Sequence, residues 1–105
     1  SSYIETIIND SPDSVKVFDN ALIPMSNADL LQDYMIRFET DITSQQFLNR
    51  DETRYREGML RFPLRTRLSN AGRTRGSWAK IRFSTNTDQK FNIFAIMAKY
   101  RKSYN

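Results

Sequence analysis

A regular alternation of apolar and other side chains constrains the fold of this chain more than any other feature. Leu60, Phe62 and Leu64 share one face of residues 58–68, and the other face carries Met59, Arg61, Pro63, Arg65 and Arg67. Residues 75–84 repeat the pattern. Successive side chains of a strand point to opposite faces of a sheet, so both stretches predict amphipathic strands. Residues 91–100 are apolar on both faces, which favours a third strand in a central or interface position.

Shorter signals surround these three strands. Residues 15–18 predict a strand that enters a turn at Asp19-Asn20, and residues 33–40 alternate as a further strand. Residues 41–57 hold too few apolar positions for a period and predict a long loop with a helical turn. Pro63 has no amide donor, so its strand should lie at an edge or contain a bulge. We expect a mainly β fold: a small antiparallel sheet with a three-strand C-terminal meander, one or two N-terminal strands, long loops and at most a short helix.

The length of 105 residues suits one compact domain. Tyr3, Ile4, Ile7 and Ile8 have the spacing of a short helical turn, and a turn signal follows them. We therefore expect residues 1–14 to be an N-terminal arm and residues 15–105 to be a single β-rich domain. The longest apolar run is much shorter than the roughly 18 to 20 residues that cross a bilayer, so no membrane contact is expected.

Charge is divided unevenly along the chain. Residues 1–52 carry 3 basic and 10 acidic side chains, whereas residues 53–105 carry 13 basic and 2 acidic ones. This division indicates either a basic face that binds a polyanion, or two oppositely charged halves that meet within one chain or between neighbouring copies. The second interpretation is favoured, because opposite patches fix register and suppress wrong partners in an assembly.

The composition argues against catalysis. The chain has no His and no Cys, which removes the commonest general base, the commonest metal ligand and the thiolate nucleophile. The acidic residues do not follow the spacing of a calcium-binding EF-hand loop, and no Ser-x-x-Lys motif occurs. We therefore expect no enzyme activity, no metal and no cofactor.

The basic second half contains a candidate nucleic-acid surface. Arginines beside an exposed Trp78 would resemble the stacking platforms of proteins that bind single strands. The alternative is that arginine stems cover a sheet face while Trp78 packs beneath them or against a neighbour. Residues 73–76 (RTRG) fit either an anion-binding loop or a hairpin turn. The candidate polyanion-binding residues are Arg61, Arg65, Arg67, Arg73, Arg75, Lys80 and Arg82.

Four short motifs occur in an order that resembles one family. They are KVFDN at 16–20, RYRE at 54–57, RTRGSW at 73–78 and KYRKSY at 99–104. Together they are similar to the C-terminal region of the large tail proteins of crAss-like short-tailed phages, over about residues 12–105. In that family the region closes a long β-rich polypeptide of the tail muzzle or nozzle, a ring through which cargo and genome leave.

The resemblance implies an architectural role in the virion tail, with assembly in the host cytoplasm. The chain would be a processed C-terminal fragment or an excised domain, in contact with the larger part of the tail protein, with neighbouring copies, and with other tail or cargo proteins. Any DNA contact would not be sequence-specific. The expected interface residues are Phe18, Trp78, Phe91, Phe94, Tyr100, Arg101 and Tyr104.

Two other functions stay open on the sequence alone. The first is a module that binds single-stranded nucleic acid through Arg61, Arg65, Trp78 and Arg82. The second is a small inhibitor or adaptor that docks on an acidic partner.

Overall fold

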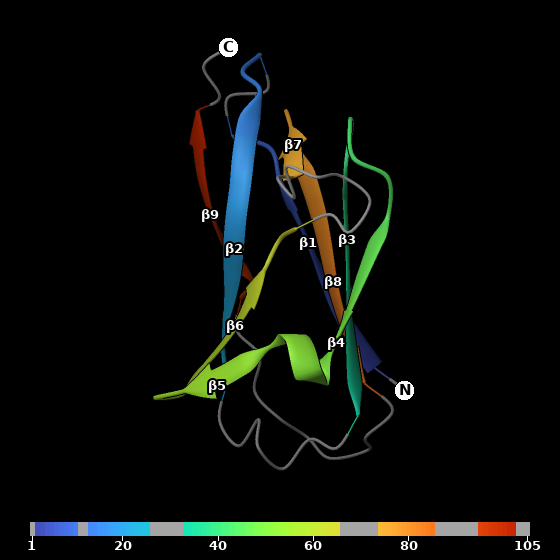
Figure 1. The fold of residues 1–105 in the computed structure, drawn as a ribbon, viewed down its shortest axis with the longest axis vertical. Coiled ribbons are helices and arrows are strands. Elements are labelled where there is room, and N and C mark those ends of the chain that lie inside the picture. The colour runs from blue at the N-terminus through green and yellow to red at the C-terminus, as the bar shows by residue number, and fades with distance from the viewer. Residues whose placement is uncertain (1, 11–12, 26–32, 66–73, 86–94, 103–105) are drawn as a thin grey trace.

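A computed structural model describes residues 2–10, 13–25, 33–65, 74–85 and 95–102 (Figure 1). Strands and one short 3-10 helix, η2, make up nearly all of the regular structure in these residues. Their bounds are β1 (Ser2–Ile8), β2 (Lys16–Pro24), β3 (Tyr34–Thr40), β4 (Gln46–Asn49), η2 (Arg50–Glu52), β5 (Arg54–Arg56), β6 (Met59–Pro63), β7 (Thr74–Gly76), β8 (Ala79–Thr85) and β9 (Met97–Lys102).

The strands form two antiparallel sheets that pack face to face. Sheet A has the order β1-β8-β3-β4. Sheet B has the order β5-β6-β2-β7, and β9 pairs with β2 along the opposite edge of that strand. In Figure 1, sheet B lies on the left and sheet A on the right, with η2 joining β4 to β5 below. The molecule is therefore a β-sandwich with an outer face on each sheet.

The core lies between the sheets and follows from the alternation of the strands. Ile81 and Phe83 of β8 point inward, as do Phe62 of β6 and Ile36 of β3, and each is at most 1% exposed. Burial of side chains of this size stabilises the fold by about 1.5 to 3 kcal/mol each. The buried hydrophobic cluster consists of Phe18, Ala21, Ile23, Met25, Tyr34, Ile36, Phe38, Leu48, Leu60, Phe62, Leu64, Ala79, Ile81, Phe83 and Ile96.

The chain crosses from sheet B to sheet A between β7 and β8, at Ser77 and Trp78. A carboxylate oxygen of Asp41, Oδ1, accepts hydrogen bonds from the amides of Ser77 at 2.8 Å and Trp78 at 3.4 Å. The buried Lys16 donates from Nζ to the carbonyl of Ser77 at 2.5 Å. At Gly76 an added Cβ would lie 2.5 Å from both Asp41 Oδ1 and Thr40 Cβ. Only glycine fits this close approach between β7 and the end of β3.

The predicted mainly β class is confirmed, but the predicted meander is corrected. β6 and β9 both pair with β2 in sheet B, whereas β8 pairs with β1 and β3 in sheet A. The expected strand over residues 75–84 is interrupted at the crossover, which places β7 and β8 in different sheets. Of the strand expected over residues 91–100, residues 91–94 lie outside the described residues; β9 begins at Met97 and forms an edge of sheet B in the described part of the chain, so the expected interface position stays a prediction.

Local expectations also changed. Residues 2–8 form β1, which pairs with β8 along its length, where a helical turn was expected. The same spacing fits a strand that is apolar on both faces. The expected turn at Asp19-Asn20 is a register shift within β2, and residues 41–57 contain β4 and β5 beside the expected helical turn. Pro63 is the last residue of β6, a strand between β5 and β2, and it lies beyond the residues that pair with β5.

Candidate functional site

The charged side chains on the outer face of sheet A form ion pairs with one another. Glu5 of β1 accepts a hydrogen bond from Arg82 Nε of β8 at 3.0 Å, and Arg37 Nη2 of β3 lies 3.8 Å from the same carboxylate oxygen. One row beyond, Lys80 Nζ lies 3.9 Å from a Glu39 oxygen. These contacts follow the strand register, because Glu5, Arg82 and Arg37 are direct neighbours across three strands. The guanidinium groups of this face are therefore already engaged.

Exposed apolar side chains frame these ion pairs. Tyr3 and Ile7 flank Glu5 on the outer side of β1 and are 64% and 60% exposed. Met35 of β3 and Phe47 of β4 are also exposed on this face. Arg82 lies 4.2 Å from the centroid of the Tyr3 ring, a cation–π contact. We name this surface the apolar face; it consists of Tyr3, Ile7, Met35 and Phe47 around the paired charges.

The outer face of sheet B is different, because most of its charges are positive and form no ion pair with another described residue. Arg54 and Arg61 are direct register partners on β5 and β6, and both are exposed. Among the described residues only Asp19 supplies an acid on the strands of this face, and its carboxylate lies 3.5 Å from Arg101 Nε. We name this surface the basic face; its described, exposed cations are Arg54, Arg56, Arg61, Arg65, Lys99 and Arg101.

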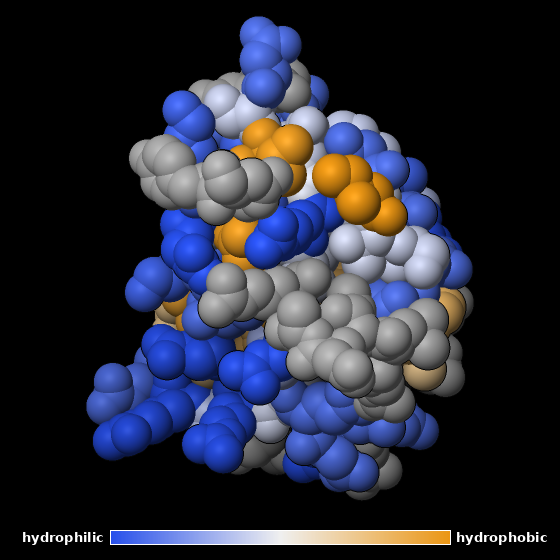
Figure 2. All heavy atoms as spheres, turned by 45° about the horizontal axis from the view of Figure 1, so that its top comes forward, coloured by the Kyte–Doolittle hydropathy of each residue, from blue (hydrophilic) through white to orange (hydrophobic). Residues whose placement is uncertain are grey.

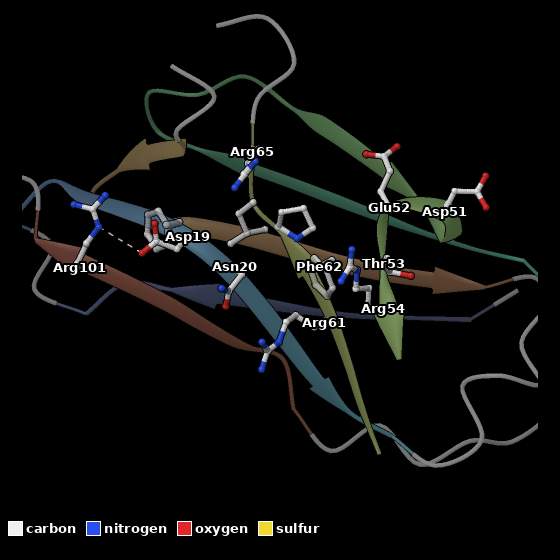
Figure 3. Close-up of a pocket in the computed structure, with 13 residues that line it drawn as sticks. Asp19, Asn20, Asp51, Glu52, Thr53, Arg54, Arg61, Phe62, Arg65 and Arg101 are labelled. Atoms are coloured by element: carbon white, nitrogen blue, oxygen red, sulfur yellow. Dashed lines mark ion pairs between the residues drawn. The ribbon is translucent and has the colours of Figure 1, made fainter. Parts of the chain in front are cut away.

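A hollow of about 960 Å³ borders the basic face and reaches the buried side chains of Phe18, Phe62 and Leu64. Its cationic lining comes from Arg54, Arg61, Arg65 and Arg101. In Figure 3 these side chains surround the hollow from β5, β6, β9 and the residues that follow β6, while the acids of η2 lie together at one end. Those acids are Asp51 and Glu52. In the space-filling view the most hydrophilic side chains gather at the lower left, on the side of β5 and β6 (Figure 2).

The two oppositely charged parts of the sequence meet within one chain. The pairs Arg82–Glu5, Lys80–Glu39 and Arg101–Asp19 each join a base from the second part to an acid from the first. These ion pairs match the alternative in which the two oppositely charged halves meet within one chain. They also use the cations of β8 and leave those of β5 and β6 without a described carboxylate partner.

The expected interface residues have different environments. Phe18 is 1% exposed and belongs to the core, where its ring lies 5.7 Å from that of Tyr100. Trp78 is partly buried at the crossover. Tyr100 donates its hydroxyl to Asp10 at 2.7 Å, and this hydrogen bond raises the pKa of Tyr100. Of the set, only Arg101 has an exposed side chain in the described part of the chain. Phe91, Phe94 and Tyr104 lie outside the described residues.

The predicted single platform for nucleic acid is corrected. Arg61 and Arg65 belong to the basic face, whereas Lys80 and Arg82 point out of sheet A on the opposite side of the sandwich. Trp78 lies at the crossover between the sheets and not beside Arg61. Arg75 is partly buried in β7, and Arg67 and Arg73 lie outside the described residues. The structure therefore does not assemble the stacking surface that the alternation suggested.

Several residues of both faces were missed from the sequence. Arg54 and Arg56 fell in a stretch interpreted as a loop, although RYRE followed by Gly58 is a hairpin signal. Glu57 and Gly58 do form the turn there, both with positive φ. Glu5 was hidden by the helical interpretation of residues 3–8. The signal for its role was its position between two apolar outward residues, Tyr3 and Ile7.

The described residues lack two further features. They contain no group of three or more acidic, His or Cys side chains arranged to hold a metal ion. Nor does any helix in that part of the chain have the length and hydrophobicity to span a membrane.

Comparison with known proteins identifies the family. A family model described as the Crassvirus muzzle protein C-terminal domain matches residues 1–67. The matched region contains two of the four motifs, at 16–20 and 54–57, and the strands from β1 to β6. A search of curated proteins gave no match. The chain therefore belongs to the family of crassvirus muzzle protein C-terminal domains and is a structural component of the virion tail.

Proposed function

We propose that this domain is a non-catalytic building module of the tail muzzle, in which it contacts neighbouring copies and the larger part of the muzzle polypeptide. The muzzle would form the exit for the genome and cargo. The observation that carries this proposal is the family match over residues 1–67. The lack of His and Cys in the sequence supports a role without catalysis.

The apolar face supports assembly through sheet A. Its charges are paired within the domain, so a partner can cover them without leaving a buried charge alone. Tyr3, Ile7 and Phe47 then supply the kind of exposed apolar and aromatic area that protein interfaces bury. We place a protein partner on this face.

The edge strand β1 of sheet A offers a second kind of contact to a neighbouring chain. Isolated edges attract other strands unless lysines, prolines, bulges or short length protect them. β4 and β5 are short, and β9 carries Lys99, Arg101 and Lys102 beside a register shift in its partner. β1 has seven residues in unbroken register, with no Lys or Pro. A strand of a neighbouring muzzle polypeptide can therefore extend sheet A at β1.

Charged substitutions on the apolar face test this function in the assembled virus. Ile7→Lys combined with Phe47→Lys, introduced into the phage genome, should reduce the number of particles that carry a complete muzzle by at least about tenfold, because two charges would be buried at an interface. Negative-stain microscopy of purified particles measures this. Both side chains are exposed, so the domain should still fold, and circular dichroism of the isolated chain checks that.

Met97→Lys is the matched control, because Met97 is exposed on the strand β9 of the other sheet. It should leave the muzzle intact. Normal particles with the double variant would overturn the assignment of the apolar face. A chain that stays monomeric and co-purifies with one protein that is not part of the virion would instead support an adaptor.

A further inference from the structure

The basic face carries a binding site of its own, and we propose that it contacts the phosphate backbone of double-stranded DNA. The proposal deepens the proposed function, because it names the domain surface that meets the genome in the muzzle. It rests on the cations of β5 and β6 that have no described carboxylate partner, their register, the scarcity of described exposed apolar side chains around them and the position of the nearby acids.

The register of β5 and β6 brings like charges together. Arg54 and Arg61 are direct cross-strand partners, an arrangement that destabilises a sheet unless an anion lies between or above the two groups. In the described part of the chain, no carboxylate forms an ion pair with Arg54, Arg61 or Arg65. Two guanidinium groups held side by side without an acid form a ready site for a phosphate, which arginine can bind through two parallel hydrogen bonds.

The cations extend across the whole width of sheet B. Arg56 continues the row from Arg54, and Lys99 and Arg101 lie on β9 at the opposite edge, with β2 between them and β6. Arg61 comes from β6 and Arg101 from β9, the two strands on either side of β2, and Arg65 follows the end of β6 (Figure 3). Such a broad distribution of positive charge matches a polymer of phosphates better than a single small anion.

The face lacks what a protein partner or unpaired bases would need. Met97 is the one exposed large hydrophobic side chain on the strands of sheet B, as far as the structure describes them. Protein interfaces normally have an apolar centre, and single strands are held by stacking on exposed aromatic rings. Phe18 and Phe62 also line the hollow, but each is at most 1% exposed, so neither ring is available for stacking. Backbone contact with a duplex, without sequence preference, is the mode that these side chains favour.

The acids near the hollow indicate which part of the basic face the duplex contacts. Asp51 and Glu52 lie on η2 at one end of the hollow, beyond Arg54 (Figure 3). They repel phosphates, so the duplex lies over β6, β2 and β9 and avoids η2. Asp51→Asn should consequently strengthen binding, and a weakened binding in that variant would contradict this placement.

Salt-dependent binding of a mixed-sequence DNA duplex to the purified chain, followed by fluorescence anisotropy, tests the proposal. The logarithm of the binding constant should fall linearly with the logarithm of the salt concentration. In the triple variant Arg54→Gln, Arg61→Gln and Arg65→Gln, the slope should become shallower by about 0.9 for each phosphate that the variant no longer neutralises.

The matched control removes three cations from the opposite side of the sandwich. Arg37→Gln, Lys80→Gln and Arg82→Gln change the net charge equally but remove side chains that are already paired. If its circular dichroism shows a folded chain, it should keep the slope of the unmodified protein. A control that loses the ion pairs and unfolds is replaced by the single variant Lys80→Gln, compared with Arg61→Gln.

Three results would overturn the proposal. They are an absence of DNA binding at low salt, an equal decrease of slope in the two triple variants, and a preference for polyglutamate over DNA that the basic-face variant abolishes. The last would identify an acidic protein as the partner. The experiment is independent of assembly: Ile7→Lys with Phe47→Lys should still bind DNA, so failure of the muzzle proposal and failure of this one give different results.

Discussion

The two outer faces of the sandwich both carry arginines and lysines, but they differ in the charge of the residue that lies across the strand pair. On sheet A, the strand register sets Arg82 opposite Glu5. On sheet B, it sets Arg61 opposite Arg54. Composition alone cannot distinguish these cases, because both arginines stand between inward apolar residues of an alternating strand. The neighbour across the sheet decides whether a guanidinium group stabilises the fold or is available to a partner.

Substitution at the crossover should have the largest effect, because the crossover holds the two faces in relation to each other. Gly76→Ala places a Cβ within 2.5 Å of Thr40 and Asp41, so β7 or the end of β3 must move. Overpacking of this kind lowers the free energy of unfolding by about 1 to 3 kcal/mol. Urea denaturation followed by circular dichroism measures the loss. Gly58→Ala, which meets no atom within 4 Å, is a control for steric contact, although its φ of +78° adds backbone strain. Equal midpoints for Gly76→Ala and the unmodified chain would contradict the close approach.

Neutralising one arginine on each face should change stability with opposite signs. Arg82→Gln removes the hydrogen bond to Glu5 and the contact with Tyr3, and should lower the free energy of unfolding by about 1 kcal/mol. Arg61→Gln removes a like-charge cross-strand neighbour and should raise it by about 0.2 to 1 kcal/mol. The same urea titrations compare the two variants. Both changes in the free energy of unfolding should become smaller as salt is added, since salt screens exposed charges. A shift of both variants in the same direction would mean that register does not separate the faces.

The smallest expected effect on stability comes from the contact between Asp10, which follows β1, and Tyr100 of β9. The hydrogen bond to Asp10 raises the pKa of Tyr100. A raised pKa means that the folded state favours the protonated phenol, so the contribution is present below about pH 10 and disappears as the pH rises through the folded-state pKa. Ultraviolet titration of tyrosinate should show one late-ionising group, which Tyr100→Phe and Asp10→Asn both remove. If a late-ionising tyrosine persists in Asp10→Asn, the raised pKa does not come from the hydrogen bond to Asp10.

Alternation predicted those parts of the fold that depend on local pattern. The inward residues of β6 and β8, such as Phe62 and Phe83, were identified correctly because every second residue is apolar. The assignment of strands to sheets was missed, since nothing local marks Ser77 and Trp78 as a crossover. Their amides depend on Asp41, which lies far away in the sequence. Because the crossover was missed, the sequence also predicted one nucleic-acid surface where the structure has two separate faces. Arg61 and Arg82 have the same local pattern, and only the crossover between the sheets places them on opposite sides of the sandwich. β4 and β5 were missed because strands of three or four residues give no period.

The pairing of β1 with β8 also determines when this domain can be completed during synthesis. Glu5 and Arg82 are 77 residues apart in the chain, yet they meet side by side on sheet A. Closing so long a loop carries an entropic cost that local contacts do not share, and folds dominated by distant pairs form slowly. Within this domain β1 is synthesised long before β8, which is its neighbour in the described part of sheet A. The edge strand β1 therefore waits for its partner through most of the synthesis of this domain, which makes this interval the period of greatest risk for premature association between nascent muzzle chains.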